Sequence, residues 1–526
     1  MTADSSPRNL VLTGFMGAGK TTVGREVALR LGRPFIEMDA EIARRAGKSI
    51  PEIFREDGEE TFRQMERDLC RELAAREGVV IATGGGALID EENRRALAGN
   101  GCLICLDCEP RELLQRLQHD DGRPMLWADD RAERVRELLQ ARRPAYARIP
   151  YHVDTTHRSK EQVVDDVIRI YMADPIIWQV RTPGGEYPVH LMPGGLAHLG
   201  ALLAAHGIGR NVVVVSDEHV WPLHGRRIQE GLQAGGYSAT PIILPPGEQH
   251  KTPEMVSSLY DRFLDAGLDR SGAVIAMGGG VITDMAGLAA STFMRGVPLV
   301  PVPTTLLGMV DASVGGKVAV DLPRGKNLVG AFVEPLMVML DPETLNTLPD
   351  IERRAGLAEI IKAGVIADPA LFAALEEGEP PLRQQVQRAL QVKIAVVEED
   401  PYERGRRAVL NLGHTFAHAF EVLGDYRLHH GLAVSIGMAA AAHLAHARGL
   451  CSADTLRRII ATLQRHNLPV TYGEHDPAAV YRAMGSDKKR RGNTLRFILP
   501  RDIGAVMIAD DVSEGEVIAA LERIHP

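Results

Sequence analysis

The chain has 526 residues, 45% hydrophobic and 25% charged, with a formal net charge of −9. At about 100–200 residues per domain this length predicts roughly three folding units, and the composition excludes a disordered or collagen-like protein. The acidic balance and the lack of a long basic run argue against a nucleic-acid partner. Residues 1–9 are polar, and the longest apolar run, 432–442, is shorter than the ~20 residues of a membrane span. We therefore expect a cytoplasmic protein with small-molecule partners.

Residues 9 to about 165 alternate short apolar runs with amphipathic segments. This alternation is typical of βαβ units around a parallel sheet, and a helix over 162–172 closes the series. Asp174-Pro175 then favours a break, because proline disfavours the helical conformation in the residue before it. We therefore expect a first domain over 1–172. The apolar runs predict its strands at 10–12, 35–37, 79–82 and 103–106.

A glycine-rich motif, Gly14-Phe15-Met16-Gly17-Ala18-Gly19-Lys20-Thr21, connects the first predicted strand to the first helical segment. Glycines let successive backbone N–H groups turn toward one anion, and a helix N-terminus adds its positive dipole end. Lys20 can reach the β- and γ-phosphates, and the Thr21 hydroxyl can bind Mg²⁺. In this strand–loop–helix context the motif predicts a site for ATP and Mg²⁺, formed by Gly17, Ala18, Gly19, Lys20, Thr21 and Thr22.

Charged residues and glycines after the following strands predict the acceptor side of this site. Asp39 follows the second strand, where a carboxylate can hold a hydroxyl and accept its proton. Arg63 lies one helical turn before Glu66 and can be oriented by it. Two or more arginines beside one aspartate suit a small carboxylated polyol, although a single arginine is more often a solvated surface group. The further candidates are Gly84, Gly85 and Gly86 after the third strand, Arg123 in a polar segment, and Arg142 with its neighbour Arg143.

In order along residues 8–165, the motifs GFMGAGKTT, MD, FRQME, GGG, RPML and R-x-P-x-Y resemble those of shikimate kinase. The resemblance implies in-line transfer of a phosphoryl group from ATP to shikimate, with Lys20, Asp39 and Arg142 as catalytic residues. Arg123 would belong to a lid over the phosphates. Glu37 stands where the family usually has an aspartate near Mg²⁺. The implied shikimate ligands are Asp39, Arg63, Gly84, Gly85, Gly86 and Arg142, with Arg143 as the alternative to Arg142.

The five cysteines do not predict a disulfide framework. Cys102, Cys105 and Cys108 have the spacing C-x-x-C-x-x-C, which is compatible with a metal site. They coincide with the predicted strand at 103–106, however, and no further cysteine or histidine cluster follows nearby in the sequence to complete a tetrahedral site. We interpret them as part of a buried strand.

A second α/β series begins near residue 176, and its strands are followed by Gly, Asp, Glu or Thr, as is typical of ligand-binding sheet edges. From about residue 350 the strand-like runs disappear and helical periodicity continues to about 470. Two late apolar runs, 495–499 and 504–508, predict a small hairpin. We therefore expect an α/β domain over 176–345 and a mostly helical domain over 346–526. The strands of the α/β domain are predicted at 212–216, 241–244, 274–277 and 299–302.

Polar residues crowd the segments after these strands. Gly278-Gly279-Gly280 follows an apolar run and lets a pyrophosphate lie close to backbone N–H groups, although G-x-G-x-x-G itself is absent. Polar side chains between apolar strands are more typical of a site than of a core. The candidates are Glu248 and Lys251 after one strand, and Thr304, Thr305, Asp311, Lys317, Lys326 and Asn327 after another.

Three residues of the helical part form a candidate metal site. His414 and His418 lie at i and i+4 on one helix face, and His430 follows soon after. Glu359 precedes Lys362 by three residues, again on one face. Glu359, His414 and His430 can form a Glu/His/His site that leaves positions open for substrate oxygens. Helical histidines are also often hydrogen-bonded core or surface groups, so spacing alone leaves both interpretations open.

Residues from about 176 to 520 resemble 3-dehydroquinate synthase, because the motifs GGGVITD, FMRG, VPTTLL, MVDASVGGK, GKNLVGAF, LAEIIK, LNLGHTFAHAFE and HHG occur in family order. The resemblance implies Zn²⁺ or Co²⁺ on Glu359, His414 and His430, and catalytic roles for Arg295, Lys317, Lys362 and His418. Thr283 stands where the family usually has glycine, and a β-branched residue restricts a turn. The implied NAD⁺ ligands are Asp217, Glu248, Lys251, Gly278, Gly279, Gly280, Asp284, Thr304, Thr305 and Lys326. The implied substrate ligands are Arg295, Asp311, Lys317, Asn327, Lys362, Arg407, Asn411, His418 and one of Lys488 or Lys489.

Together the two resemblances imply a bifunctional enzyme: an N-terminal P-loop kinase domain with a parallel sheet, then an α/β NAD-binding domain and a mostly helical metal-binding domain. The synthase reaction implied is removal and return of a hydride by NAD⁺, elimination of phosphate and closure of a carbocycle by an internal aldol. By analogy with the family, we expect a homodimer through the synthase part. Two alternatives stay open: a nucleotide-binding regulatory module fused to an active synthase, and an NAD- and metal-dependent polyol dehydrogenase.

Overall fold

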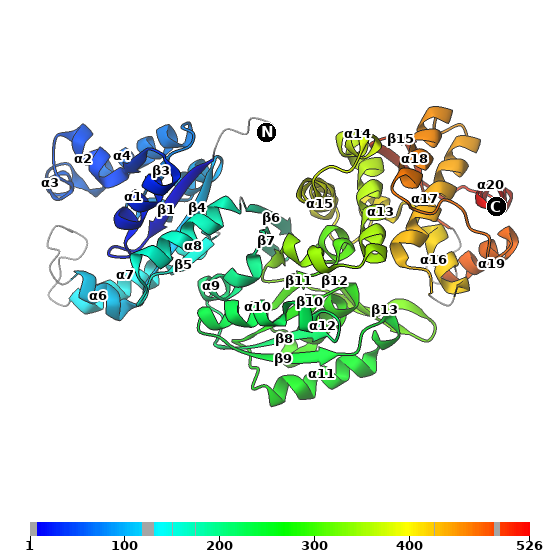
Figure 1. Cartoon of the computed structure of the whole chain (residues 1–526), viewed down its shortest axis with the longest axis horizontal. Helices are drawn as coiled ribbons and strands as arrows, with labels where there is room; N and C mark the ends of the chain where they lie inside the picture. The colour runs from blue at the N-terminus through cyan, green and yellow to red at the C-terminus, as the bar shows by residue number, and fades with distance from the viewer. Residues whose placement is uncertain (1–7, 118–130, 150, 174, 425–426, 489–494) are drawn as a thin grey trace. The chain divides into compact units, whose positions relative to one another are not determined.

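The computed structural model describes residues 8–117, 131–149, 151–173, 175–424, 427–488 and 495–526. Its chain forms two compact units (Figure 1). The first unit consists of Met1–Ile177, Leu196–Arg210 and Arg227–Ser238, and the second of Trp178–Gly195, Asn211–Arg226 and Ala239–Pro526. The division at residues 172–176 and 345–346 that the sequence suggests stays a prediction.

The first unit contains five strands, β1 (Asn9–Gly14), β2 (Phe35–Glu37), β3 (Val80–Ala82), β4 (Gly101–Asp107) and β5 (Tyr151–Asp154). They form one parallel sheet in the order β2-β3-β1-β4-β5. The central strand β1 is buried along its whole length, as a parallel sheet between helices requires. The four strands predicted from apolar runs are confirmed. Apolar runs do not reveal β5, because His152 and Asp154 interrupt its apolar pattern.

Helices connect these strands and pack against the sheet (Figure 1). Helix α1 begins at Lys20, directly after Gly19, whose φ of 95° suits glycine. Ser49 and Ser159 start α3 and α8 with capping boxes, and α8 confirms the predicted closing helix. The helices are α1 (Lys20–Leu31), α2 (Met38–Ala46), α3 (Ile50–Glu56), α4 (Gly58–Ala74), α5 (Glu91–Ala98), α6 (Pro110–Leu117), α7 (Arg131–Tyr146), α8 (Lys160–Met172) and α9 (Leu199–Ala205), while α10 (Trp221–Ala234) has residues in both units.

The second unit contains the other predicted α/β strands, β8 (Asn211–Asp217), β9 (Ser238–Leu244), β10 (Ala273–Gly278) and β11 (Leu299–Pro303). They lie in the order β11-β10-β8-β9, and β10 is parallel to both β8 and β11. Helices α11 (Pro253–Asp265) and α12 (Gly280–Thr292) share one apolar core with this sheet. Among the residues of that core are Val213, Phe263 and Met285. All four predicted strands are confirmed.

Within the described residues, the second unit contains three further small sheets. β6 (Ile176–Thr182), β7 (Gly185–Leu191) and β14 (Val338–Leu340) form one sheet, and β12 (Lys317–Leu322) pairs antiparallel with β13 (Gly325–Phe332). The polar stretch that suggests a site from its sequence is therefore partly this hairpin. β15 (Phe497–Asp502) and β16 (Ala505–Ala509) form the predicted C-terminal hairpin.

The segment after residue 350 is helical, as predicted. Its central helix, α17, is buried on nearly all sides and packs against α13, α16 and α20. A Cβ at Gly431 would lie 1.9 Å from the carbonyl oxygen of Ala355, so a glycine lets the start of α17 touch α13. The helices are α13 (Asp350–Ala367), α14 (Pro369–Glu377), α15 (Leu382–Glu399), α16 (His414–Leu423), α17 (His430–Ala447), α18 (Ala453–Arg465), α19 (Pro477–Lys488) and α20 (Glu514–Ile524).

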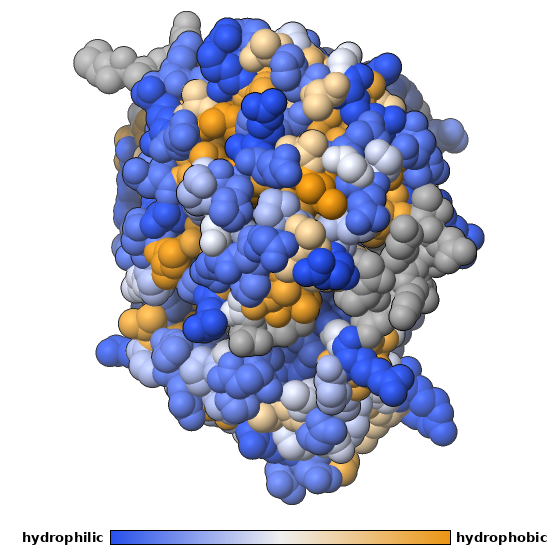
Figure 2. Space-filling view, turned by 90° about the vertical axis from the view of Figure 1, so that its right-hand side faces the viewer, coloured by the Kyte–Doolittle hydropathy of each residue, from blue (hydrophilic) through white to orange (hydrophobic). Residues whose placement is uncertain are grey.

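Figure 2 looks onto this end of the chain and shows mostly hydrophilic side chains, with apolar ones in separate groups between them. Among the helices of the described ranges, none combines the length and the hydropathy needed to cross a bilayer.

Candidate functional site

The glycine-rich motif of the first unit forms the loop between β1 and α1. Gly14 ends β1 with φ of 131°, and a Cβ there would lie 2.3 Å from the carbonyl oxygen of Leu106. Lys20 donates from Nζ to the carbonyl oxygens of Gly14 (2.9 Å) and Phe15 (3.0 Å), which folds its ammonium group over the loop. The Thr21 hydroxyl donates to Glu37 Oε1 at 2.7 Å. The structure thus brings together the lysine and the two oxygen ligands expected for a phosphate–Mg²⁺ site.

The predicted acceptor residues meet beside this loop. A Cβ on Gly84 would lie 2.7 Å from Asp39 Oδ1 and 2.8 Å from Glu66 Oε1, and a Cβ on Gly86 would lie 2.7 Å from Arg63 Nη1. Arg63 donates to Glu66 Oε2 at 2.6 Å, which confirms the predicted orientation of Arg63 by Glu66. Burial raises the pKa of Glu66 even though the positive charge of Arg63 opposes it. The glycines therefore leave room for three charged side chains around one small space.

The structure separates the two candidate arginines at the end of α7. Arg142 is buried and donates from Nη1 to the carbonyl oxygen of Gly85 at 3.0 Å, whereas Arg143 is exposed. The guanidinium carbon of Arg142 lies 5.4 Å from the ring centre of Phe15 in the phosphate loop. Arg142 thus connects the loop to the acceptor glycines. Arg123 lies outside the described residues.

Sequence patterns missed Arg116, which contacts the phosphate loop. Its guanidinium group donates to the carbonyl oxygens of Gly17 (3.3 Å) and Thr155 (2.8 Å). An arginine near the end of an amphipathic helix such as α6 is ordinarily a surface group, so the sequence gives no specific signal for this role.

The strand interpretation of the cysteines is confirmed for Cys102 and Cys105, which lie buried in β4. Cys105 does lie near two other potential ligands, Asp107 and His152, within 4.8 Å. His152 Nδ1 is 2.7 Å from Asp107 Oδ2 and its Nε2 is 3.0 Å from the carbonyl oxygen of Ile149. Both ring nitrogens therefore already face acceptors, which favours an imidazolium ion that pairs with Asp107 over a metal ligand.

In the second unit, Glu359 of α13, His414 of α16 and His430 of α17 converge. One ligand atom from each lies within 4.8 Å of the others, and the Nε2 atoms of His414 and His430 are 4.0 Å and 3.9 Å from Glu359 Oε1. Lys362 forms an ion pair with Glu359, but within the described ranges neither buried carboxylate oxygen of Glu359 accepts a hydrogen bond. A buried carboxylate without hydrogen bonds beside two imidazoles fits a divalent metal ion such as Zn²⁺.

The helices bring these ligands together through close backbone contacts. Gly413, with φ of 82°, starts α16, and a Cβ on Gly437 of α17 would lie 2.1 Å from the Gly413 carbonyl oxygen. Burial, followed by the charge of Lys362, lowers the pKa of His414 well below its ordinary value, so this imidazole stays neutral. A neutral imidazole is the form that binds a metal.

The predicted dinucleotide residues form one buried and one half-buried ion pair around the β12–β13 hairpin. Lys251 Nζ lies 2.6 Å from Asp284 Oδ2 and donates to Asn327 Oδ1 at 2.6 Å. Burial alone would lower the pKa of Lys251, but the charges of Asp284 and Glu248 outweigh it and raise the pKa. Lys326 Nζ lies 3.3 Å from Glu248 Oε1. Four residues of the expected NAD⁺ set thus form two ion pairs, and Asn327 of the expected substrate set contacts one of them, Lys251.

The glycine turn itself follows β10. Gly279 caps α12, and a Cβ on it would lie 3.2 Å from Thr305 Cγ2. Thr283 does not lie in this turn: it is helical, and its hydroxyl donates to the carbonyl oxygen of Gly280 at 3.1 Å. The expectation that its β-branch restricts the turn is therefore wrong. Thr304 is buried, and its N–H donates to the carbonyl oxygen of Gly278. Asp217 lies at the end of β8, where its side chain accepts from the N–H groups of His219 and Val220.

The predicted substrate residues divide into two contact groups. Lys393 Nζ lies 2.5 Å from Asp311 Oδ1, and the charges of Lys393 and Lys362 outweigh burial and lower the pKa of Asp311. Glu403 forms an ion pair with Lys317 and accepts from Asn411 Nδ2 at 2.7 Å.

The other predicted substrate residues do not take part in these ion pairs. Arg407 is fully buried and donates to the backbone carbonyl oxygens of Gly315 and Pro401. The ring centre of the exposed His418 lies 5.7 Å from that of His414. Arg295 is exposed in the turn Phe293–Arg295, and no contact within the described residues joins it to the other candidates. Lys488 ends α19 and its side chain is not described, and Lys489 lies outside the described residues.

Sequence patterns missed three charged residues of this site, Lys393, Glu403 and Glu421. A lysine in the apolar stretch QVKIAVV of α15 is a signal for Lys393. Glu421 follows His414 by seven residues, which places both on one face of α16. Glu403 lies in a loop and has no such pattern.

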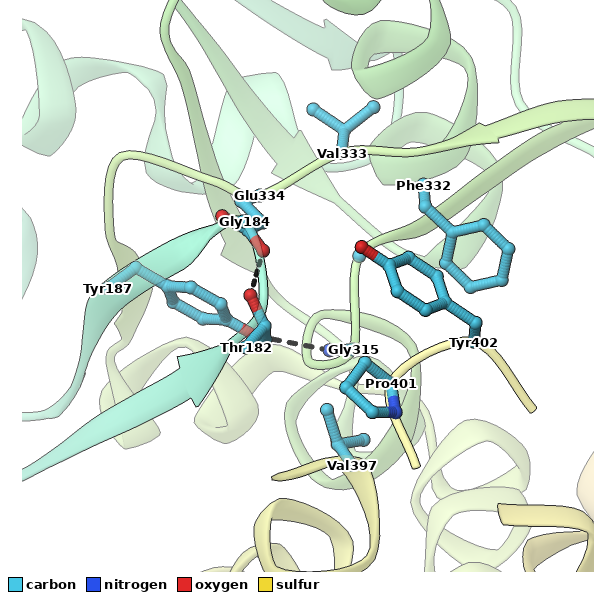
Figure 3. A pocket seen from close by; sticks show the side chains of 11 residues that line it. Thr182, Gly184, Tyr187, Gly315, Phe332, Val333, Glu334, Val397, Pro401 and Tyr402 are labelled. Carbon is cyan, nitrogen blue, oxygen red and sulfur yellow. Dashed lines mark hydrogen bonds between the residues drawn. The ribbon is translucent and has the colours of Figure 1, made fainter. Parts of the chain in front are cut away.

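A cavity of about 280 Å³ is lined by residues of β6, β7, β13 and α15 and of the loops next to them (Figure 3). Phe332 and Tyr402 lie at its side with their rings nearly perpendicular and their centres 5.4 Å apart, and the Tyr187 hydroxyl accepts from the N–H of Gly315 at 3.3 Å. None of its lining residues belongs to the predicted site.

Three family models match the chain: shikimate kinase over residues 16–171, the N-terminal part of 3-dehydroquinate synthase over 241–355, and its C-terminal part over 356–490. The 3-dehydroquinate synthase of Synechocystis sp. is 44% identical over 356 residues, which are 65% of this chain and 98% of that protein. The chain belongs to the 3-dehydroquinate synthase family. A shikimate kinase domain precedes and is fused to this synthase.

Further relatives agree with this assignment. The 3-dehydroquinate synthase of Desulforamulus reducens is 42% identical over 355 residues, covering 66% of this chain and 99% of that protein. The structure of ValA, the 2-epi-5-epi-valiolone synthase of Streptomyces hygroscopicus with NAD⁺ and Zn²⁺ bound, is 32% identical, with a TM-score of 0.60 over 66% of this chain and 99% of that one. The expected combination of α/β and helical parts is therefore confirmed.

Proposed function

We propose that the chain is a bifunctional shikimate-pathway enzyme with two separate active sites. The kinase domain phosphorylates shikimate with ATP to shikimate 3-phosphate. The synthase domain converts 3-deoxy-D-arabino-heptulosonate 7-phosphate to 3-dehydroquinate and phosphate. The observation that carries the synthase assignment is the convergence of Glu359, His414 and His430 in a chain that belongs to this family.

In the kinase site, Asp39 holds the acceptor hydroxyl and takes its proton, while Glu66 fixes Arg63 to bind the substrate carboxylate. Lys20 and the loop N–H groups neutralise the phosphates, and Thr21 with Glu37 holds Mg²⁺. ATP, when bound, supplies the phosphoryl group. Arg142, which contacts both Phe15 of the phosphate loop and Gly85, neutralises the charge on the transferred group.

In the synthase site, Glu359, His414 and His430 hold the divalent ion, which when bound stabilises negative charge on substrate oxygens. Lys251, Lys326, Glu248 and Asp284 orient NAD⁺, which supplies a hydride acceptor that is restored by the end of the cycle. His418, exposed at the edge of the metal cluster, carries protons. Lys317, Lys362 and Lys393 bind the phosphate and carboxylate groups of the substrate. The partners of the chain are small molecules, together with a second copy of the chain in a homodimer.

Reciprocal variants test this proposal on the full chain. We expect His414→Ala to abolish phosphate release from the heptulosonate phosphate while leaving shikimate-dependent ATP consumption intact, and Asp39→Asn to do the reverse. Loss of both activities in either variant contradicts separate sites. ATP consumption without a need for shikimate indicates a regulatory nucleotide module, and net accumulation of NADH indicates a polyol dehydrogenase.

A further inference from the structure

Glu421 is a buried carboxylate between the metal cluster and the dinucleotide residues. It lies on α16, seven residues after His414, and its side chain is 3% exposed. Its Oε1 atom lies 3.3 Å from His430 Nδ1 and also 3.3 Å from Lys326 Nζ. One oxygen atom is thus shared by a metal ligand and by a lysine of the NAD⁺ set.

The His430 ring uses its two nitrogens in different directions. Nδ1 faces Glu421, whereas Nε2 faces Glu359 Oε1 at 3.9 Å. Because the Lys326 ammonium group can only donate, the Glu421 Oε1 atom that it shares with His430 Nδ1 is an acceptor. Nδ1 therefore carries the proton, and the lone pair of Nε2 points into the cluster. A carboxylate behind a histidine in this way fixes its tautomer and raises its basicity toward a metal.

The ammonium group of Lys326 contacts two carboxylates. Its Nζ lies 3.3 Å from Glu421 Oε1 and 3.3 Å from Glu248 Oε1. Lys326 and Glu248 both belong to the set expected to bind NAD⁺. A continuous chain of contacts therefore runs from Glu248 through Lys326 and Glu421 to His430.

We propose that Glu421 is a positioning residue that couples NAD⁺ binding to metal binding in the synthase site. This inference rests on the proposed function. A dinucleotide phosphate beside Lys326 competes with Glu421 for the ammonium group. Once Lys326 turns toward the dinucleotide, the full negative charge of Glu421 acts on His430, which then binds the metal more tightly. Because linkage is reciprocal, the metal raises the affinity for NAD⁺ by the same factor.

The test is a Zn²⁺ titration of the metal-free full chain against a chromophoric chelator, with and without saturating NAD⁺. For the wild-type protein we expect NAD⁺ to lower the Zn²⁺ dissociation constant by at least about 5-fold, a typical coupling factor. In Glu421→Gln, which keeps the shape but not the charge, Zn²⁺ binding without NAD⁺ weakens by about 10–100-fold. The effect of NAD⁺ on the Zn²⁺ constant then disappears to within about 2-fold.

Two further variants separate coupling from folding. Lys326→Met leaves the charge of Glu421 undivided, so it binds Zn²⁺ without NAD⁺ at least as tightly as wild type, yet shows no effect of NAD⁺. Glu376→Gln removes a carboxylate that pairs with Arg458 in the same helical part, and we expect it to retain both the Zn²⁺ affinity and the coupling. Thermal unfolding of each metal-free variant reports on its fold.

A Glu421→Gln protein whose Zn²⁺ constant and NAD⁺ effect both match wild type overturns this inference alone. So does a Lys326→Met protein that keeps the full NAD⁺ effect. A wild-type chain that binds neither Zn²⁺ nor NAD⁺ overturns the proposed synthase function, and the inference with it.

Discussion

The phosphate loop of the kinase domain is made of consecutive residues, Gly14 to Thr21, and its anion site is built from backbone N–H groups and one lysine. The metal cluster of the synthase draws Glu359, His414 and His430 from three different helices. The first site depends on the local conformation of glycines, and the second on helix packing and on charges that compensate each other in pairs. Loss of one residue should therefore have local consequences in the kinase and wider ones in the synthase.

Beyond the reciprocal variants at His414 and Asp39, the largest effect on one activity alone is expected from Lys20→Ala. Its ammonium group donates to two carbonyl oxygens of the loop itself, so we expect the fold to survive the substitution. We expect the kinase kcat to fall by about 10²–10³-fold, as when one preorganised donor to a developing charge is removed, while synthase turnover stays unchanged. Coupled assays for ADP and for phosphate measure the two rates. Lys160→Ala, at an exposed lysine of α8, is the matched control. If Lys20→Ala lowered the synthase rate in parallel, the effect of the substitution would not be confined to the kinase site.

Lys393→Met tests how strongly the synthase site depends on its paired charges. It leaves the Asp311 carboxylate beside the apolar side of α15 without its 2.5 Å partner. Breaking a buried ion pair by removing one partner costs on the order of 3 kcal/mol, and urea unfolding of the synthase unit measures it. Arg457→Met, in an exposed pair with Asp454, should cost less than about 1 kcal/mol. Equal costs in the two variants would show that the buried pair is not structural.

The His152–Asp107 pair extends the comparison to pH. Burial alone would lower the pKa of His152, but the charge and hydrogen bond of Asp107 outweigh it and raise the pKa. A pKa raised by folding stabilises the protein below the unfolded pKa of about 6.5, and this contribution is lost as pH rises through the folded pKa. We expect the unfolding temperature of the kinase unit to fall as the pH rises above about 6.5, and Asp107→Asn to remove most of that slope. A flat wild-type profile would contradict the ion pair.

Thr283→Gly should have the smallest effect. Because Thr283 lies in the first turn of α12 rather than in the glycine turn, the substitution should cost about 1 kcal/mol of stability, as glycine does inside a helix. The NAD⁺ dissociation constant, measured by calorimetry, should change by less than about 2-fold. Thr283→Ala should restore most of the lost stability. A large gain in NAD⁺ affinity in the glycine variant would place Thr283 at the dinucleotide after all.

Patterns in the sequence predicted the strands of the two main sheets except β5, because buried parallel strands are continuous apolar runs. They did not find β12 and β13, where polar residues such as Lys317 and Asn327 alternate with apolar ones in a hairpin. The Glu/His/His set was predicted as a possibility, whereas Lys393, Glu403 and Glu421 were not. Each of these three is recognisable only by its partner, and the partner is distant in the sequence.

The sequence by itself determined the phosphate loop and the succession of two α/β series and a helical part, and it offered Glu359, His414 and His430 as a candidate metal set. These depend on local conformation and on residue type. The tertiary structure decided that Arg142 rather than Arg143 faces Gly85, that Thr283 is helical, and that Glu421 joins His430 to Lys326. Those outcomes depend on which face of a helix is buried and on which charged side chains contact each other there. The packing of the folded chain determines both.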